Sequence, residues 1–245
     1  MDKLSKFVSA TILLPVIDEY DSLKQTINII LKHNSKEIES IFLLVHNNKT
    51  KKKSLELCEY LKKNNPKIKI IFQKLPNLGG AFRDSINHIQ TSHTVMMCSD
   101  LETDPDTVRD LIKFSNKYPD QIIQASRWID GTNFYGYGKF KVLLNYIFQK
   151  LFSFLYKTDC SDMTYGFRII PSYLLKRFSW EMTDHSFVFE VLLKPLISNI
   201  KIYSIKTKWE KRKEGKSHNT SINYLKYLFI GIIIFIRFKL KKKVF

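Results

Sequence analysis

The sequence predicts an α/β domain with a mostly parallel sheet flanked by helices, and three observations lead to this prediction. Apolar, strand-like runs alternate with segments of helical period through the first two-thirds of the chain, as in βαβ units. The chain has 245 residues, of which 44% are hydrophobic, so it can bury one large core. Acidic side chains also cluster directly after one apolar run, and open α/β sheets bind ligands at such strand ends.

The elements follow in order from the hydrophobic pattern. Strands are expected at residues 11–16, 41–45, 68–73, 94–98 and 122–126, and the helices between them at residues 21–31, 53–63 and 81–89. A further helix is expected to open at Pro105, with Asp104 as its N-cap. After Arg127, glycines interrupt an aromatic loop, and residues 140–156 form a long apolar helix that is expected to help build the site of the second substrate.

The last 25 or so residues differ in character from the rest. We expect residues 1–220 to form one domain and residues 221–245 to form a hydrophobic, basic, membrane-associating helix. Its apolar run, residues 224–237, is shorter than the about 20 residues that span a bilayer. A helix lying in the membrane interface is therefore favoured over a short spanning anchor, and a final helix docked on the core is the alternative.

Charge and cysteine content limit the environment of the protein. The formal net charge of +17 suits an anionic membrane surface, phosphorylated substrates or nucleic acid, and part of it can be an ordinary solvated basic face. The three cysteines, Cys58, Cys98 and Cys160, are widely spaced and form no Cys-x-x-Cys pair, which argues against disulfides or a thiolate zinc site. With no secretory signal at the start, the reducing cytosol is the expected compartment.

The acidic cluster is the first candidate site. Asp100 and Glu102 stand two residues apart in a turn after a strand, where both carboxylates can face one divalent cation. Mg²⁺ or Mn²⁺ prefers such oxygen ligands and can neutralise a diphosphate. Asp104 is better explained as a helix cap, and a solvated polar turn is the alternative for the whole cluster.

Three other segments combine glycine with polar or cationic residues. Residues 77–81, Asn-Leu-Gly-Gly-Ala, lie between a strand and a helix, where glycines allow close approach of backbone to a ligand. Residues 162–168 and 212–217 each pair a glycine with an arginine, whose guanidinium can bind phosphate oxygens with two hydrogen bonds. Each segment alone is also typical of an ordinary turn.

In this order, the segments resemble family 2 glycosyltransferases of the GT-A fold, a Rossmann-like architecture. The branch resembled most is that of dolichyl-phosphate mannose synthase and bacterial polyprenyl-phosphate glycosyltransferases. Residues 15–19 resemble the family's Pro-x-x-Asn-Glu motif, residues 98–101 its Asp-x-Asp-Leu metal motif, and residues 126–127 its Ser-Arg strand end. Residues 162–168 resemble its Asp-x-x-x-Gly-Phe-Arg segment and residues 212–217 its Arg-x-x-Gly-x-Ser loop.

The resemblance implies roles for individual residues. The nucleotide-sugar site would comprise Pro15, Ile17, Glu19, His46, Asn77, Gly79, Ser99, Asp100, Arg168, Arg212 and Ser217. Catalytic roles would belong to Asp100, Arg127 and Asp162, and the metal, Mg²⁺ or Mn²⁺, to Asp100 and Glu102.

The sequence also departs from the family pattern. Cys98 replaces the first aspartate of the metal motif, and Asp18 replaces an asparagine. The second strand ends in His46-Asn47-Asn48 where relatives have two aspartates, so the nucleotide base cannot be carried over; His46 is expected to act there as a hydrogen-bond donor.

The expected function is inverting transfer of a sugar from a nucleotide-sugar donor to a membrane-linked acceptor such as polyprenyl phosphate. This would occur at the cytoplasmic face of the membrane, in cell-envelope polysaccharide synthesis, with no nucleic-acid partner. The alternative acceptor is a hydroxyl group of a lipopolysaccharide, capsule or other glycan, which requires a base, with Asp162 and Glu190 as candidates. Glu190, on an apolar segment, is equally compatible with a structural role.

Two readings from other classes remain open. A nucleotidyltransferase would need a glycine-rich, arginine-containing loop after the first strand, and residues 18–21 offer none. A non-catalytic, basic membrane-binding or nucleic-acid-binding protein with a degenerate metal site would explain Cys98, and it predicts that Asp100→Asn has no measurable effect.

Overall fold

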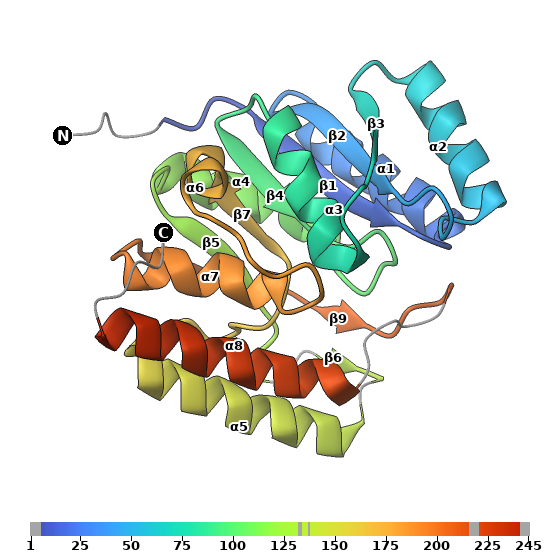
Figure 1. The fold of residues 1–245 in the computed structure, drawn as a ribbon. Coiled ribbons are helices and arrows are strands. Elements are labelled where there is room, and N and C mark those ends of the chain that lie inside the picture. Colours follow the sequence, from blue (N-terminus) through green and yellow to red (C-terminus); the bar gives the residue numbers. More distant parts are fainter. Residues whose placement is uncertain (1–5, 132–133, 137, 216–220, 241–245) are drawn as a thin grey trace.

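The computed structural model describes residues 6–131, 134–136, 138–215 and 221–240 and contains a seven-stranded, mostly parallel sheet (Figure 1). The strands are β1 (Ala10–Val16), β2 (Ile38–Val45), β3 (Ile68–Phe72), β4 (His93–Met96), β5 (Ile122–Ser126), β7 (Arg168–Pro171) and β8 (Ile202–Lys206). Their order is β3-β2-β1-β4-β7-β5-β8, and β7 alone runs antiparallel to its two neighbours. The predicted fold class is confirmed, and four of the five predicted strands differ from the observed ones by a few residues at their ends.

Helices cover both faces of this sheet. On one face lie α1 (Asp21–Asn34), α2 (Lys52–Asn64) and α4 (Thr107–Lys117); on the other lie α3 (Asn77–Ser85), α5 (Lys139–Tyr156), α6 (Ser172–Arg177), α7 (Phe187–Ile197) and α8 (Ser221–Lys239). A 3-10 turn, Ile86–His88, follows α3. A short ribbon of β6 (Phe134–Tyr135) and β9 (Trp209–Glu210) lies beside the main sheet.

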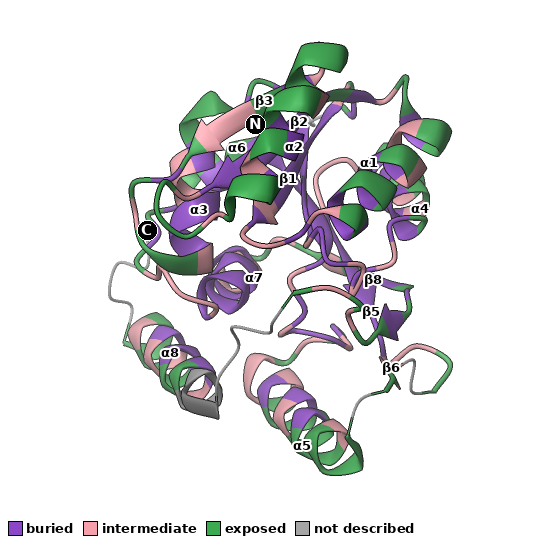
Figure 2. Ribbon diagram, turned by 90° about the vertical axis from the view of Figure 1, so that its right-hand side faces the viewer, coloured by how far each residue is buried: buried purple, intermediate pink, exposed green. Residues whose placement is uncertain are grey.

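Two hydrophobic cores form because both faces of the sheet are covered. Along β1, Ile12 and Leu14 face the core under α1 and α4, while Leu13 faces the core under α3 and α7. A strand segment buried on both faces needs apolar residues at successive positions, which is why residues 12–16 of β1 and 41–45 of β2 are continuous apolar runs in the sequence. Figure 2 shows the buried strands between the two helical layers.

Several boundaries differ from the sequence prediction. Helix α3 begins at Asn77, not residue 81, so the two glycines lie inside its first turn. A Cβ on Gly79 would lie 2.5 Å from the Phe187 Cβ atom, and a Cβ on Gly80 would lie 2.6 Å from the Leu75 backbone. These glycines therefore serve tight helix packing. Strands β7 and β8 were not predicted, because short strands without alternation carry little local signal.

The predicted N-cap of the next helix is also wrong. Helix α4 begins at Thr107 with Asp106 at the N-cap position, and Asp106 makes no side-chain capping bond. The Asp104 carboxylate instead accepts the Asp106 backbone N–H at 3.1 Å, which fixes the turn in front of the helix.

The C-terminal segment folds back onto the domain. From α8, the side chains of Tyr227, Ile230 and Ile234 are buried in the core that α7 also lines. Gly231 permits this packing, because a Cβ there would lie 2.2 Å from the Phe152 ring of α5. Within the described residues, no helix combines the length and the apolar character needed to cross a bilayer.

Candidate functional site

A pocket of about 590 Å³ opens where β1, β2 and β4 end, at the carboxyl edge of the parallel strands. This is where open α/β sheets bind ligands. Seven of the predicted residues line it: Pro15, Ile17, Glu19, His46, Asn77, Asp100 and Arg212. The edge therefore gathers segments that lie far apart in the sequence.

The acidic cluster after β4 faces a single cation. The Asp100 side chain is almost fully buried, and its Oδ1 atom accepts the Glu102 backbone N–H at 3.0 Å. Arg212 donates from Nη2 to Asp100 Oδ2 at 2.7 Å and from Nε to Glu102 Oε1 at 2.9 Å. Both carboxylates are thus aimed at the Arg212 guanidinium, and the divalent cation expected from the spacing of the two acids stays a prediction.

Burial and like charge shift the pKa values in this cluster. Burial, followed by the neighbouring Glu102 carboxylate, raises the pKa of Asp100 to about 7 against the opposing effect of Arg212. Although burial opposes it, the hydrogen bond to Glu102 and the charge of Asp100 raise the pKa of Arg212. Burial raises the pKa of the Cys98 thiol well above its usual value, so this residue is a neutral thiol at neutral pH.

The donor set fits a hard divalent cation held partly by substrate. Among the described residues, no three His, Cys, Asp or Glu side chains converge as a complete metal site. Asp100 and Glu102 offer two carboxylates, and Mg²⁺ typically binds through one or two carboxylates plus substrate phosphates and water. The neutral Cys98 thiol adds nothing that such a cation prefers.

The loop after β1 is held rigid by its own acidic residue. Glu19 Oε2 accepts the backbone N–H groups of Ile17 at 2.7 Å and Asp18 at 3.1 Å. Ser99, predicted to bind the nucleotide sugar, is buried and donates its hydroxyl to the Pro15 carbonyl at 2.7 Å. In this structure Ser99 supports the pocket from beneath, and Glu19 shapes its wall.

The loop that carries Arg212 closes against the start of α1. Glu214 Oε2 accepts the backbone N–H groups of Tyr20 and Ser22, each at 3.0 Å, and so caps that helix. Gly215 has a φ of +75°, and a Cβ there would lie 2.5 Å from Asp18 Oδ1. The predicted residue Ser217 lies outside the described residues.

His46 is set up as a hydrogen-bond donor. Its Nδ1 atom accepts the Asn48 backbone N–H at 3.1 Å, so the neutral ring carries its proton on Nε2. Its own backbone N–H donates to the Thr50 hydroxyl at 2.8 Å, which fixes the turn after β2. Contact with a nucleotide base stays a prediction.

Arg127 and Asp162 form a buried pair outside the pocket lining. Arg127 donates from Nε to Asp162 Oδ2 at 2.7 Å, from Nη2 to Oδ1 at 2.9 Å and from its backbone N–H at 3.1 Å. Gln149 donates to the same carboxylate at 3.3 Å, and the Arg127 guanidinium lies 4.3 Å from the centre of the Tyr165 ring. This pair joins the end of β5 to the segment before β7, and its predicted catalytic roles stay predictions.

Arg168 is buried within the protein and does not line the pocket. Its Nη2 atom donates to the Tyr165 carbonyl at 2.7 Å, while Nε and Nη1 have no hydrogen-bond partner among the described residues. Burial lowers its pKa to about 10. Its predicted contact with the donor phosphates is therefore not part of this arrangement.

Glu190 has structural partners. It is buried, forms a 2.6 Å ion pair with Lys194 and accepts the backbone N–H groups of Glu181 and Met182 at 2.9 and 3.0 Å. These contacts close the loop in front of α7. They support a structural role for Glu190 over a role as the catalytic base.

Sequence reasoning missed part of the pocket wall. Asp18, Lys49, Lys51, Gln73, Leu78, Cys98, Asp184, His185 and Lys226 also line it. Asp184 Oδ2 pairs with Lys226 Nζ of α8 at 2.6 Å, and its Oδ1 accepts the Ser186 backbone N–H at 2.9 Å. Although burial opposes it, these bonds lower the pKa of Asp184. The Asp-x-Ser sequence before an apolar helix is a local capping signal, but nothing local links it to Lys226.

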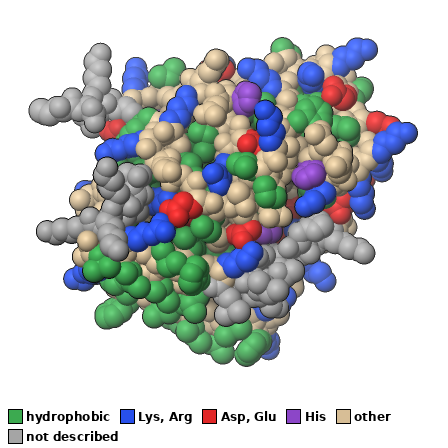
Figure 3. Space-filling view, viewed as in Figure 1, with side chains coloured by type: hydrophobic (Ala, Val, Ile, Leu, Met, Phe, Trp, Pro, Cys, Tyr) green, Lys and Arg blue, Asp and Glu red, His purple; other side chains and the backbone are tan. Residues whose placement is uncertain are grey.

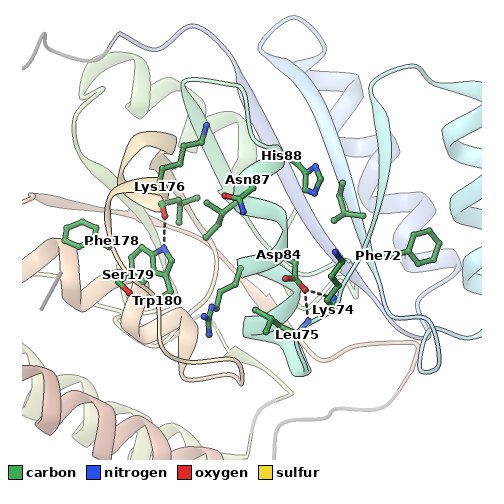
Figure 4. Close-up of a pocket in the computed structure, with 14 residues that line it drawn as sticks. Phe72, Lys74, Leu75, Asp84, Asn87, His88, Lys176, Phe178, Ser179 and Trp180 are labelled. Atoms are coloured by element: carbon green, nitrogen blue, oxygen red, sulfur yellow. Dashed lines mark hydrogen bonds between the residues drawn. The ribbon is translucent and has the colours of Figure 1, made fainter.

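A second cavity, of about 690 Å³, lies between β3, α3 and α6 (Figure 4). Asp84 Oδ2 there accepts the backbone N–H groups of Lys74 and Leu75 at 2.6 and 2.8 Å, and Trp180 Nε1 donates to the Leu175 carbonyl at 2.7 Å. These polar groups form hydrogen bonds with the protein backbone. None of the predicted site residues lines this cavity, so the smaller pocket at the sheet edge is the candidate site.

Comparisons with known proteins identify the fold and the family. A structure of glucosyl-3-phosphoglycerate synthase from Mycobacterium tuberculosis with Mn²⁺, UDP and phosphoglyceric acid is similar, with a TM-score of 0.69 and 13% identity over 94% of this chain and 77% of that one. A structure of the same enzyme with Mg²⁺ and UDP gives a TM-score of 0.68 and 12% identity over 96% and 80%. At these identities the likeness concerns the fold alone.

The sequence comparisons are more specific. No curated protein matches the chain. The family described as glycosyl transferase family 2 matches residues 11–178, which is more than half of the chain and contains the loop after β1, the acidic cluster and the Arg127–Asp162 pair. The resemblance drawn from the ordered motifs is confirmed, and the protein belongs to glycosyl transferase family 2, the glycosyltransferases that use nucleotide-sugar donors.

Proposed function

We propose that this enzyme transfers a sugar, with inversion, from a nucleotide sugar to a membrane-linked acceptor phosphate such as polyprenyl phosphate. The observation that carries the proposal is the set of paired charges on the pocket wall. Four cationic side chains, Lys49, Lys51, Arg212 and Lys226, line it together with four carboxylates, those of Asp18, Glu19, Asp100 and Asp184, and two histidines. Lys51, Arg212 and Lys226 form ion pairs with these carboxylates, so cations that phosphates can bind and acids that a metal ion can bind lie side by side. A pocket of this composition suits two phosphorylated substrates, a donor diphosphate and an acceptor phosphate.

The donor diphosphate would lie against the acidic cluster. Asp100 and Glu102 would hold Mg²⁺ or Mn²⁺, which when bound supplies positive charge to the leaving diphosphate. Arg212 now satisfies both carboxylates, so it would have to leave them and could then bind phosphate oxygens itself. The Mn²⁺, Mg²⁺ and UDP in the structures of similar fold support a nucleoside diphosphate and a divalent cation here.

A phosphate acceptor and a hydroxyl acceptor differ in whether the enzyme must supply a base. A phosphate acceptor is already an anion and needs no base, whereas a sugar hydroxyl must lose a proton. Both proposed bases are engaged, Asp162 with Arg127 and Glu190 with Lys194. Asp184 does line the pocket, but its lowered pKa makes it a weak base. A phosphorylated acceptor is therefore favoured, and the phosphoglyceric acid in a structure of similar fold is in keeping with it.

A glycan hydroxyl is the second candidate acceptor. Asp184 is the observation in its favour, since it places a carboxylate in the pocket where a proton acceptor would have to lie. On either reading we place the enzyme at the cytoplasmic face of the membrane, in keeping with its three free thiols.

The test is to offer the purified full-length chain a panel of nucleotide sugars with Mg²⁺ or Mn²⁺ and to measure nucleoside diphosphate release with and without polyprenyl phosphate. We expect release that polyprenyl phosphate stimulates. Asp100→Asn should lower it by about 10²-fold or more, whereas the matched change Asp104→Asn should leave it near wild type. Stimulation by glycan oligosaccharides alone would move the assignment to the second acceptor, and no release from any donor would overturn the proposal.

A further inference from the structure

Helices α5 and α8 lie side by side on the outside of the domain, with α7 between them and the sheet (Figure 1, Figure 2). The Tyr156 hydroxyl donates to the Gly231 carbonyl at 2.6 Å, and the Tyr156 and Phe235 rings meet edge to face at 5.7 Å. The two helices are therefore joined to each other, and together they present one outer surface.

The outer side of α5 is apolar. Its exposed residues include Phe140, Leu143, Leu144, Ile147, Leu151 and Phe154, and Phe154 is 85% exposed. Their spacing of three and four residues places them on one side of the helix, opposite the side that buries Asn145, Gln149 and Phe152. Surface helices normally carry polar residues on such an outward face, so the apolar outer side of α5 is unusual.

The outer side of α8 repeats this arrangement. Phe229, Ile232 and Ile236 are exposed at intervals of three and four residues, and Leu240 follows four residues later. Tyr227, Ile230 and Ile234 form the opposite, buried side. Figure 3 shows hydrophobic side chains gathered over both helices. We call this surface, made of the exposed apolar residues of α5 and α8, the α5–α8 face.

The charges that α5 and α8 themselves carry are all positive, and the nearby acids come from other segments: Glu181 pairs with Arg237, Asp184 pairs with Lys226, and Asp159 lies beside Phe154 and Lys239. Neither helix contains an Asp or Glu residue. Lys139, Lys141 and Lys150 are exposed on α5, and Lys239 is exposed on α8. An apolar stripe bordered by cations matches the interface of an anionic bilayer, where acyl chains receive the apolar side chains and lipid phosphates receive the lysines.

We propose that the α5–α8 face docks in the plane of an anionic lipid bilayer. A second copy of the chain fits less well, because pairing two such faces would bring together the exposed lysines of both copies, and neither helix contains an acid to offset them. The proposal of membrane docking depends only on the surfaces of the two helices. The role of this docking in bringing a lipid acceptor to the site rests on the proposed function. Lys226 of α8 lines the donor pocket, so a bilayer on this face would hold the tail of a lipid phosphate beside the site.

The experiment measures co-sedimentation of the full-length chain with vesicles of phosphatidylcholine, with and without phosphatidylglycerol. We expect binding that requires phosphatidylglycerol and weakens with added salt. Phe140→Ser with Phe154→Ser should lower the partition coefficient by about tenfold or more, because two exposed aromatic side chains leave the interface. The matched control is Tyr60→Ser on α2, whose side chain is also exposed, at 62%, but lies on another surface.

The outcomes separate docking from chemistry. Equal binding of the double variant and Tyr60→Ser would overturn the proposal, as would a wild-type dimer in sedimentation equilibrium that the double variant abolishes. Thermal unfolding of both variants near the wild-type temperature confirms that the fold is kept. Nucleoside diphosphate release with a short-chain, water-soluble polyprenyl phosphate should be unchanged in the double variant. If the wild type binds vesicles but releases no diphosphate, the proposed function fails and the docking stands.

Discussion

Arg212 occupies the place between Asp100 and Glu102 that a metal ion would need. Its guanidinium lies 2.7 Å from one carboxylate and 2.9 Å from the other, and the loop that carries it is anchored at Glu214 on the start of α1. One arginine thus balances a buried acidic pair whose members would otherwise repel each other. If Asp100 and Glu102 hold the metal, as proposed, metal binding and release of Arg212 would be coupled events.

Removing this cation should change metal affinity and turnover in opposite directions. For Arg212→Gln without nucleotide, we expect about tenfold tighter Mn²⁺ binding, because the competing charge-assisted hydrogen bonds are lost. The kcat/KM for the donor should fall, since the same side chain is expected to bind phosphate. Titration of Mn²⁺ followed by electron paramagnetic resonance measures the first effect, with Lys213→Gln as the neighbouring control. Unchanged Mn²⁺ affinity would contradict the coupling.

Arg168 presents the opposite case, a buried cation with incomplete hydrogen bonding. Two of its nitrogens lack a partner among the described residues. Replacing such a charge with an apolar side chain of similar length is typically neutral or stabilising, so Arg168→Met should leave the free energy of unfolding unchanged or raise it by up to about 4 kcal/mol. Urea denaturation measures this. A stable Arg168→Met variant that has lost donor binding would instead support the phosphate contact inferred from the family resemblance.

At the scale of elements, helix α3 shows how packing sets a boundary that local propensity does not. Its first turn contains Gly79 and Gly80, which are poor helix formers, yet the turn is helical because it packs against the Phe187 side chain and the Leu75 backbone. The start of this helix forms part of the pocket wall through Asn77 and Leu78. The close packing therefore positions the site.

The variant Gly79→Ala should show whether close packing or helix propensity has the larger effect on stability at this position. Gly79→Ala favours the helix locally, but its Cβ would meet Phe187, so we expect a loss of about 1–3 kcal/mol in unfolding free energy. Gly138→Ala is the control, because nothing lies within 4 Å of a Cβ there. Thermal and urea unfolding of the two variants give the comparison, and equal stability would show that the interface between α3 and α7 relaxes freely.

At the scale of the whole molecule, the sheet gathers one site from eight segments. The ends of β1, β2, β3 and β4, the start of α3, the loop before α7, the loop after β9 and the first part of α8 all border the same pocket. Two of the covering helices contact the segments that border the pocket. The start of α1 binds the loop that carries Arg212 through Glu214, and Lys226 of α8 pairs with Asp184. Stability of the sheet and integrity of the site are consequently linked.

His93 should make that stability sensitive to acid. It is fully buried in β4, its Nε2 atom lies 2.9 Å from the Pro119 carbonyl, and burial lowers its pKa. As pH falls below the unfolded value of about 6.5, the unfolded chain takes up a proton that the folded chain resists, so stability falls by at most about 1.4 kcal/mol per pH unit. Above that pH His93 is neutral in both the folded and the unfolded chain, so it adds no pH dependence to the free energy of unfolding. Urea unfolding between neutral and mildly acidic pH should show a smaller loss for His93→Gln, and parallel curves for the two proteins would contradict this.

Much of the fold could be predicted from local pattern. The strands β1, β2 and β5 and the helices α1 and α2 were found because their apolar spacing is a property of neighbouring residues. The acidic cluster was located at a sheet edge for the same reason, since Asp100 and Glu102 directly follow the β4 region. Strand β7 was missed because its four residues run antiparallel between distant partners, which no local period reveals.

The sequence by itself determined the fold class, the family and the position of the acidic pair, because these depend on spacing within short segments and on the order of motifs. Only the tertiary structure decided which charges meet. Arg212 pairs with Asp100 across 112 positions and Lys226 with Asp184 across 42, while Arg168 turns into the protein interior. The structure also decided that α5 and α8 share an outer apolar face. Such pairings depend on how the elements pack, and that is a property of the whole core.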